Sequence, residues 1–387
     1  MHVDPDSSVL AAARGFQTEL RERADEIETA RKLPQDISDR FASAGFYRAC
    51  VPELYGGLEL PPTETAHMIE LLGRADASAA WCAFIGATSG SVLAMIPESE
   101  ARAIFENPNI RICGVFAPNG RAEQSETGFR VNGRWAWGSG TQNAEYVLAG
   151  CMLTKDGEIL RSEGGVPQNH MMIVPAADVR FHDTWNVSGL SGTGSTDFEL
   201  ADVDVPQERA VGFLQRSPLE RPLYAFSLFG LLSMGIAAVT LGVARAAIDE
   251  LITLASAKKP SASRRTLAER PHTQANVAQA EAELRSARAF YFETIEAAWE
   301  QASSQGRTSI ELRRDLRLAT THAVRASVRT VDAMYELGGG TSVYRTSPLQ
   351  RMFRDVHTAT QHIMVAQPTF EVVGRLLLGV ETDTTQL

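Results

Sequence analysis

The spacing of apolar residues divides the chain into two helical regions with a strand-rich region between them. One helical face near the start is formed by Leu10, Ala13, Phe16 and Leu20. Residues 63–74 and 99–106 also have intervals of three and four, while residues 52–57 are rich in turn formers and are expected to be a loop. The pattern predicts an N-terminal α-helical domain over residues 1–112.

The middle of the chain, residues 113–212, alternates apolar and polar positions in short runs. These runs are FRVNGRWAW, YVLAGCML, HMMIVPA and DFELADVDVP. Gly, Asn, Asp and Pro separate them, which is typical of strands joined by turns. We expect a middle antiparallel β domain, either a sheet or a small barrel.

Helical periodicity returns in the last region, residues 213–387. The expected helices are residues 236–256, 274–301, 315–337 and 349–365. The third is followed by three glycines at 338–340, a natural C-cap. The most apolar segment, 226–243, is interrupted by Ser, Gly and Thr, so it is expected to be a buried core helix and not a membrane span. The fold class is therefore α+β, with a C-terminal helical bundle and a ligand held where the domains meet.

Composition narrows the choice of partner and compartment. The net charge of −10 argues against a nucleic-acid surface and gives no reason to expect an anionic membrane. The four cysteines form no CxxC pair and have no zinc-finger spacing with histidine, so we expect no metal site. Reduced thiols and a start without the features of a secretory signal favour the cytoplasm.

The chain lacks several common catalytic motifs. There is no GxGxxG after a strand, no P-loop, no GxSxG and no HExxH. Their absence argues against a Rossmann nicotinamide site.

Two segments could seat a planar ring. In the first, a strand carrying Trp135 and Trp137 is expected to end in Gly138-Ser139-Gly140. Tryptophan offers a flat apolar face, the serine hydroxyl donates and accepts, and the glycines allow a close approach to the backbone. The alternative is a core tryptophan beside a Gly-rich hairpin. In the second segment, 183–195, hydroxyls and glycines alternate, and such loops can hold a phosphate or a ring carbonyl.

Two histidines, His357 and His362, lie on the predicted fourth helix. A spacing of five residues separates them by ~140° around the axis, so they do not share a face as a metal pair would. By itself, a histidine on a helix is more often structural than catalytic.

Taken together, these segments resemble the acyl-CoA dehydrogenase superfamily. The similarity is carried, in the family's order, by GVFAPNGRA, VNGRWAWGSG, DTWNVSGLSGTGSTDFELADVDVP, GIAAVTLGVARAAIDE, LAERPHTQANVA and LQRMFRDVHTATQH. The resemblance implies an N-terminal α domain, a middle β domain and a C-terminal four-helix bundle, in agreement with the periodicity.

The resemblance does not extend to the catalytic base, the carboxylate that a dehydrogenase needs to remove a proton from its substrate. The family's usual glutamate falls on Ile363, and the alternative place before the first bundle helix, residues 228–235, holds no acid. An apolar side chain cannot take a proton. The departure is similar to the flavin-dependent monooxygenase branch, which includes two-component aromatic hydroxylases and the dibenzothiophene oxygenase.

That branch implies specific roles for residues of this chain. His362 would hold or deliver a proton, and Ser139 would bond the flavin near N5. Trp81, at the end of the D-x-S-x-x-W stretch 76–81, and Trp137 would pack against the ring. The other positions implied at the flavin are Gly138, Thr193, Ser195, Gly339 and Gly340.

The resemblance also implies partners. The flavin, FMN or FAD, would arrive reduced from a separate reductase, and its C4a-hydroperoxide would oxygenate a small aromatic or polycyclic substrate. A homotetramer is expected, in which a neighbouring subunit places a cation on the flavin phosphate. Arg264 is the candidate, among the basic residues around Ser261. A second histidine that several relatives carry after Trp81 is absent.

Two alternatives stay open at this point. One is an FAD-dependent acyl-CoA dehydrogenase with a displaced base. The other is a relative that binds flavin without chemistry.

Overall fold

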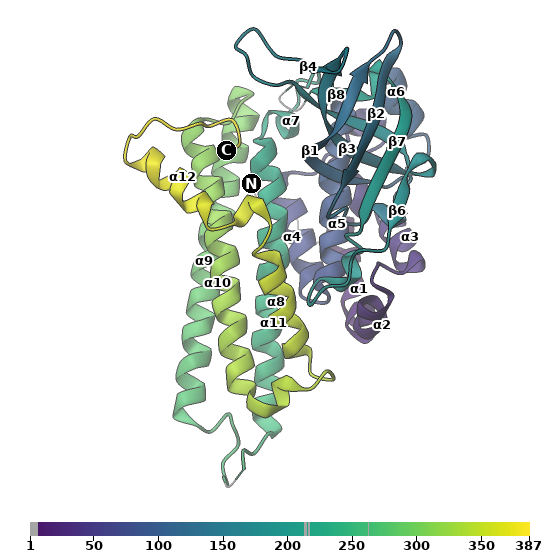
Figure 1. Ribbon diagram of the computed structural model, residues 1–387. Helices are drawn as coiled ribbons and strands as arrows, with labels where there is room; N and C mark the ends of the chain where they lie inside the picture. The colour runs from purple at the N-terminus through teal and green to yellow at the C-terminus, as the bar shows by residue number, and fades with distance from the viewer. Residues whose placement is uncertain (1–6, 213–214, 216, 262) are drawn as a thin grey trace.

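The computed structural model describes residues 7–212, 215, 217–261 and 263–387. Figure 1 shows one group of helices against the β region and a long upright bundle beside both. The N-terminal helices are α1 (Ser8–Glu22), α2 (Ala24–Ala30), α3 (Gln35–Ser43), α4 (Pro62–Gly73), α5 (Ala77–Ser89) and α6 (Glu98–Ile104). The helices expected in this region are therefore present.

The β region is one sheet of eight strands. They are β1 (Ile112–Gln124), β2 (Gly128–Trp135), β3 (Tyr146–Lys155), β4 (Glu158–Ile159), β5 (Asn169–Pro175), β6 (Arg180–His182), β7 (Asp197–Pro206) and β8 (Ala210–Gly212). Their order is β6-β7-β2-β1-β3-β5-β8, with β4 paired to β3.

The prediction of an antiparallel sheet is wrong at one pair, because β1 and β3 are parallel. β2 returns antiparallel along one edge of β1. The connection 136–145 then crosses the end of the sheet, so β3 starts again in the direction of β1 on its other edge. This crossing carries the Gly138-Ser139-Gly140 segment to the sheet end that faces α5.

The C-terminal helices are α7 (Pro222–Ala225), α8 (Leu228–Ala257), α9 (Pro271–Gln305), α10 (Ile310–Gly338), α11 (Pro348–Ala359) and α12 (Pro368–Leu377). α8 begins eight residues before the predicted start at 236, because the Ser227 side chain caps it by accepting a hydrogen bond from the backbone N–H of Gly230. Gly339 caps α10 with a φ of +54°, as the glycine run predicts.

The fourth predicted helix, residues 349–365, is wrong in its second half. α11 ends at Ala359, and a short 3₁₀ segment, Ile363–Val365, follows. The backbone of His362 is extended (φ −71°, ψ 129°), and its ring accepts a hydrogen bond from the backbone N–H of Met364. His357 and His362 are therefore not on one helix, and the predicted angle of ~140° between them does not apply. The change in chain direction after α11 sets the orientation of His362.

α5 packs directly on α8 through a glycine contact. A Cβ built on Gly235 would lie 2.0 Å from Cδ2 of Phe84, so only glycine allows this approach. Two segments, Ala77–Ala94 and Leu228–Ala257, are long and apolar enough to cross a membrane, but 94% of each is buried inside the protein. Both are core segments of the fold, and they fix α5 against the bundle.

The type of element changes from helix to strand at Ile112 and from strand to helix between Gly212 and Pro222. Residues 213, 214 and 216 lie outside the described residues. The division into units of 1–112, 113–212 and 213–387 stays a prediction.

Candidate active site

A chain of buried hydroxyls lies where the 136–145 connection meets the loop before β7. Ser139 Oγ is 2.6 Å from Ser195 Oγ, which is 2.6 Å from Thr193 Oγ1. The indole N–H of Trp81, on α5, donates to Ser139 Oγ over 3.1 Å. All four side chains are buried. The structure thus brings together four of the residues that the sequence singles out.

Backbone hydrogen bonds hold the two loops in register. The N–H of Gly138 donates to the carbonyl of Thr196 (3.1 Å), and that of Gly140 donates to the carbonyl of Thr193 (3.0 Å). Gly140 has a φ of +71°, which a glycine adopts without steric cost. These bonds fix the position of Ser139 between the loops.

The two tryptophans of the first segment differ in environment. β2 ends at Trp135, so the prediction that the strand carries Trp137 as well is wrong. Trp135 is fully buried, stacks on Phe198 and donates to the carbonyl of Gly150, as a core residue does. Trp137 has a φ of +68° and is 56% exposed. A large ring held in solvent by a costly backbone conformation is available to stack on a ligand.

The loop 183–195 is clamped to the C-terminal helices. Leu190 has a φ of +53°, and its backbone N–H donates to Asp355 Oδ1 on α11 over 2.7 Å. Gly189 lies so close to Arg354 that a Cβ would be 2.2 Å from the Arg354 carbonyl oxygen. The hydroxyls of Thr193 and Ser195 are therefore positioned by the bundle.

Two buried carboxyls support this junction. Asp76 caps α5 by accepting a hydrogen bond from the N–H of Ala79, and burial raises its pKa to about 6. Burial also raises the pKa of Asp355 to about 7, with a further contribution from the charge of Asp76. Each accepts a hydrogen bond from a backbone N–H in the structure, which gives both a positioning role.

His362 lies beside Trp81. The two ring centroids are 5.9 Å apart with an interplanar angle of 62°. Burial first, and then the charge of Arg317, lowers the pKa of His362 to about 4. The ring is thus neutral at pH 7. Because Nδ1 accepts the N–H of Met364 over 3.2 Å, the remaining proton is on Nε2.

The residue after it, Ile363, is 76% exposed. It occupies the position where a dehydrogenase of the resembling family carries its glutamate base, so the structure offers no carboxylate at that position.

Arg317, on α10, belongs to this neighbourhood but was missed by sequence reasoning. It is 7% exposed and donates to Met364 Sδ over 3.3 Å. The signal that could have found it is a charge within the buried helical stripe that includes Leu316 and Thr320.

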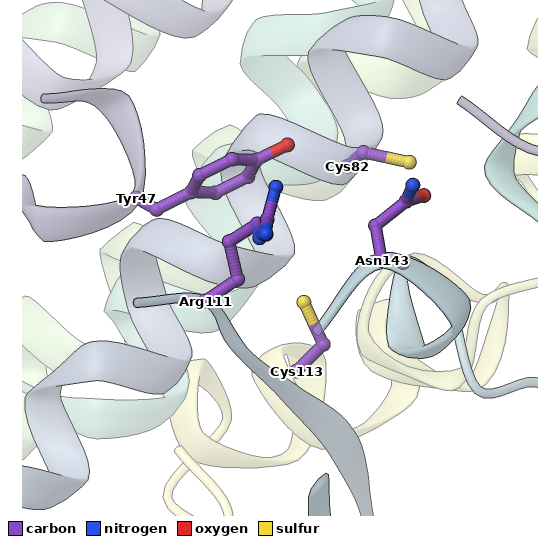
Figure 2. A pocket seen from close by; sticks show the side chains of 6 residues that line it. Tyr47, Cys82, Arg111, Cys113 and Asn143 are labelled. Atoms are coloured by element: carbon purple, nitrogen blue, oxygen red, sulfur yellow. The ribbon is translucent and has the colours of Figure 1, made fainter. Parts of the chain in front are cut away.

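A small interior pocket lies behind the site. Figure 2 shows Tyr47, Cys82, Arg111, Cys113 and Asn143 around it, and Gly140 completes the lining. It has no room for a water molecule. Arg111 is held there by ion pairs with Glu145 and Asp39, so this region is a rigid wall behind the Ser139 turn.

Other predicted residues lie away from this cluster. Gly339 and Gly340 follow α10 at the lower end of the bundle in Figure 1, and Arg264 lies in the α8–α9 connection at that same end. Lys258 joins the two segments, because its ammonium donates to the carbonyl of Gly338 (2.5 Å) and to Thr341 Oγ1 (2.7 Å). In Figure 1 this end of the bundle lies away from the sheet.

His357 pairs with Asp332 over 2.9 Å and is not part of the cluster. Within the described ranges, no group of three or more His, Cys, Asp or Glu side chains is arranged to hold a metal ion.

The residues present fit a flavin. Hydroxyls that both donate and accept suit the polar edge of an isoalloxazine ring. The exposed face of Trp137 suits its planar surface, and the Nε2–H of His362, beside Trp81, is a further donor.

Comparison with known proteins identifies the family. The family model for the acyl-CoA dehydrogenase N-terminal domain matches residues 7–99, and that for the C-terminal domain matches residues 234–367. The chain is 34% identical to indole-3-acetate monooxygenase of Pseudomonas putida, over 96% of this chain and 95% of that protein. It is 28% identical to the oxygenase component of the FADH(2)-dependent resorcinol hydroxylase of Rhizobium sp., over 97% of this chain and 95% of that protein. The crystal structure of 3-HSA hydroxylase from Rhodococcus sp. RHA1 superimposes with a TM-score of 0.90 at 25% identity, over 98% of this chain and 100% of that one.

Proposed function

Because the chain belongs to the acyl-CoA dehydrogenase family, in which it is a flavin-dependent monooxygenase and not a dehydrogenase, we propose that it oxygenates a small aromatic compound with reduced flavin and O₂. Two of the relatives named above are named for indole-3-acetate and resorcinol, both of them aromatic. Indole-3-acetate is the first substrate to test, because it belongs to the more similar of these two relatives.

The pair His362 and Ile363 carries this proposal. Dehydrogenation requires a carboxylate base, and Ile363 cannot act as one. Among the described residues the two buried acids are Asp76 and Asp355, and each accepts a hydrogen bond from a backbone N–H at a loop or helix end. His362 instead presents a neutral imidazole with its proton on Nε2.

Each residue of the cluster then has a distinct role. When bound, the reduced flavin supplies the electrons that activate O₂. Ser139 and Ser195 orient the polar edge of the ring, with Trp81 fixing Ser139 through its indole N–H. Trp137 packs on the ring face. His362 donates a hydrogen bond from Nε2 to the reacting oxygen atoms, and the buried surroundings exclude water that would divert the reaction to hydrogen peroxide.

We propose two partners as well. A separate reductase supplies the flavin, in line with the relative named as an oxygenase component. A homotetramer brings the lower end of the bundle, with Gly339, Gly340 and Arg264, to the flavin of a neighbouring subunit, because in a single chain that end lies away from the sheet. The four buried free thiols suit a cytoplasmic location.

The proposal is tested by separating the reductase from this protein with a dialysis membrane that passes FMN and FAD. A reductase and NADH on one side, with this protein and indole-3-acetate on the other, should yield oxygenated product on the protein side. Product that forms only when the two proteins share a compartment would contradict supply by diffusion. Reduction of the bound flavin by an acyl-CoA under nitrogen would instead identify a dehydrogenase.

A further inference from the structure

Arg317 is a buried cation without an anionic partner. Its side chain is 7% exposed, and its hydrogen bond is to a thioether sulfur, Met364 Sδ, which is a weak acceptor. Within the part of the chain that the structure describes, Arg317 makes no ion pair. Burial lowers its pKa to about 10, so the guanidinium still carries its charge at pH 7.

The other arginine that is buried among the described residues is paired. Arg111 is 8% exposed and contacts both Glu145 and Asp39. A buried charge that lacks a counter-ion destabilises the folded state, and folded proteins normally neutralise such a charge. The folded chain alone therefore does not compensate for the burial of the Arg317 charge, whereas an anionic ligand would.

The position of Arg317 is fixed relative to the active site. Met364, which accepts from its guanidinium, donates its backbone N–H to His362 Nδ1. The charge of Arg317 also contributes to the low pKa of His362, so the two groups are close. Arg317 projects from α10, a helix of 29 residues, which makes it a rigid anchor.

We propose that Arg317 binds the carboxylate of an aromatic acid and thereby holds its ring beside His362. This inference rests on the proposed function and narrows its substrate class. A guanidinium offers parallel N–H donors that match a carboxylate, so the pair is strong and directional. An arylacetate carries its carboxylate one carbon from the ring, and the Pseudomonas putida relative is named for such a compound.

Binding is measured by calorimetry with two probes, indole-3-acetate and its neutral amide, indole-3-acetamide. Arg317→Met should weaken binding of the acid by at least about 30-fold, because removal of one partner from a buried charge pair has effects of this size. Binding of the amide should change by less than about threefold, and Arg317→Lys should retain part of the preference for the acid. Arg325→Met, two turns along the same helix, is the matched control and should leave both affinities unchanged.

Thermal stability is a second test, because replacing an arginine with a purely structural role would lower Tm. Without ligand, Arg317→Met should raise Tm, because it replaces an unpaired buried charge with an apolar chain of similar length. Arg111→Met should lower Tm, because it leaves Glu145 and Asp39 without their partner. A fall in Tm for Arg317→Met as large as that for Arg111→Met would overturn the inference.

The inference would also be overturned if Arg317→Met lost the same factor of affinity for the acid and for the amide. Equal affinities of the wild-type protein for the two probes would overturn it as well. Should Arg317→Met not fold, Arg317→Lys and the wild-type acid-to-amide ratio decide the matter. Turnover of 3-methylindole, which has no carboxylate, separates this inference from the proposed function. Its oxygenation without any preference for acids would refute the role of Arg317 alone, whereas a failure to oxygenate any aromatic probe would refute the proposed function.

Discussion

Replacement of His362 by asparagine tests whether a neutral imidazole controls the fate of oxygen. The substitution keeps a side-chain N–H but shortens its reach and removes the imidazole that caps Met364. A positioned donor or proton-transfer group contributes about 10²- to 10⁴-fold to a rate. We therefore expect product formation to fall by at least about 10²-fold while flavin is still oxidised, so that O₂ leaves as hydrogen peroxide.

The pH profile distinguishes this role from that of an ordinary histidine. With a pKa of about 4, only about 1% of His362 is protonated at pH 6, whereas a histidine with the usual pKa of ~6.5 would be about 75% protonated. The ratio of product to peroxide in the wild-type protein should therefore stay constant between pH 5.5 and pH 8. Its acidic limb should appear only as the pH approaches about 4.

The assay supplies chemically reduced flavin, oxygenated buffer and an aromatic substrate, and measures product and hydrogen peroxide after one turnover. His357→Asn is the control, because His357 pairs with Asp332 outside the cluster. A break in the product ratio near pH 6.5 would refute a ring that is neutral because its pKa is lowered. Equal ratios in His362→Asn and His357→Asn would refute its role in the reaction.

Three further substitutions test the site and its supports. Trp137→Ala should weaken flavin binding in a fluorescence titration yet change stability by less than ~0.5 kcal/mol, because the side chain is 56% exposed; a large loss of Tm would contradict this. Asp355 stays protonated in the folded protein up to about pH 7 but ionises near pH 4 when unfolded, so its contribution to stability falls as the pH rises through that window. Asp355→Asn should therefore gain up to ~4 kcal/mol over the wild type between pH 4 and pH 8 in denaturant titrations, and a constant difference would count against the raised pKa. Gly235→Ala should lower stability by ~1–3 kcal/mol through its clash with Phe84, and an unchanged Tm would show that α5 and α8 can separate freely.

The sequence could predict most of the helices and strands because these depend on local patterns. Periodicity identifies the long helices, whereas Ser139, Thr193 and Ser195 stand out through their Gly-rich loops and through the family resemblance. The parallel pairing of β1 with β3 could not be predicted, because it depends on where the 136–145 connection crosses the sheet.

The bend at His362 could not be predicted either. The segment has helical periodicity, but the ring of His362 captures the N–H of Met364 and the helix ends before it. Arg317 was missed because its lack of a carboxylate partner depends on how the helices of the bundle pack. Only the structure shows that no carboxylate reaches it within the described residues.

The central claim is tested most directly by isotope labelling. The protein is mixed with reduced flavin and indole-3-acetate under ¹⁸O₂, and the product is analysed by mass spectrometry. A monooxygenase predicts one ¹⁸O atom in the product and none from labelled water. Product without label, or anaerobic reduction of the bound flavin by an acyl-CoA, would contradict the account.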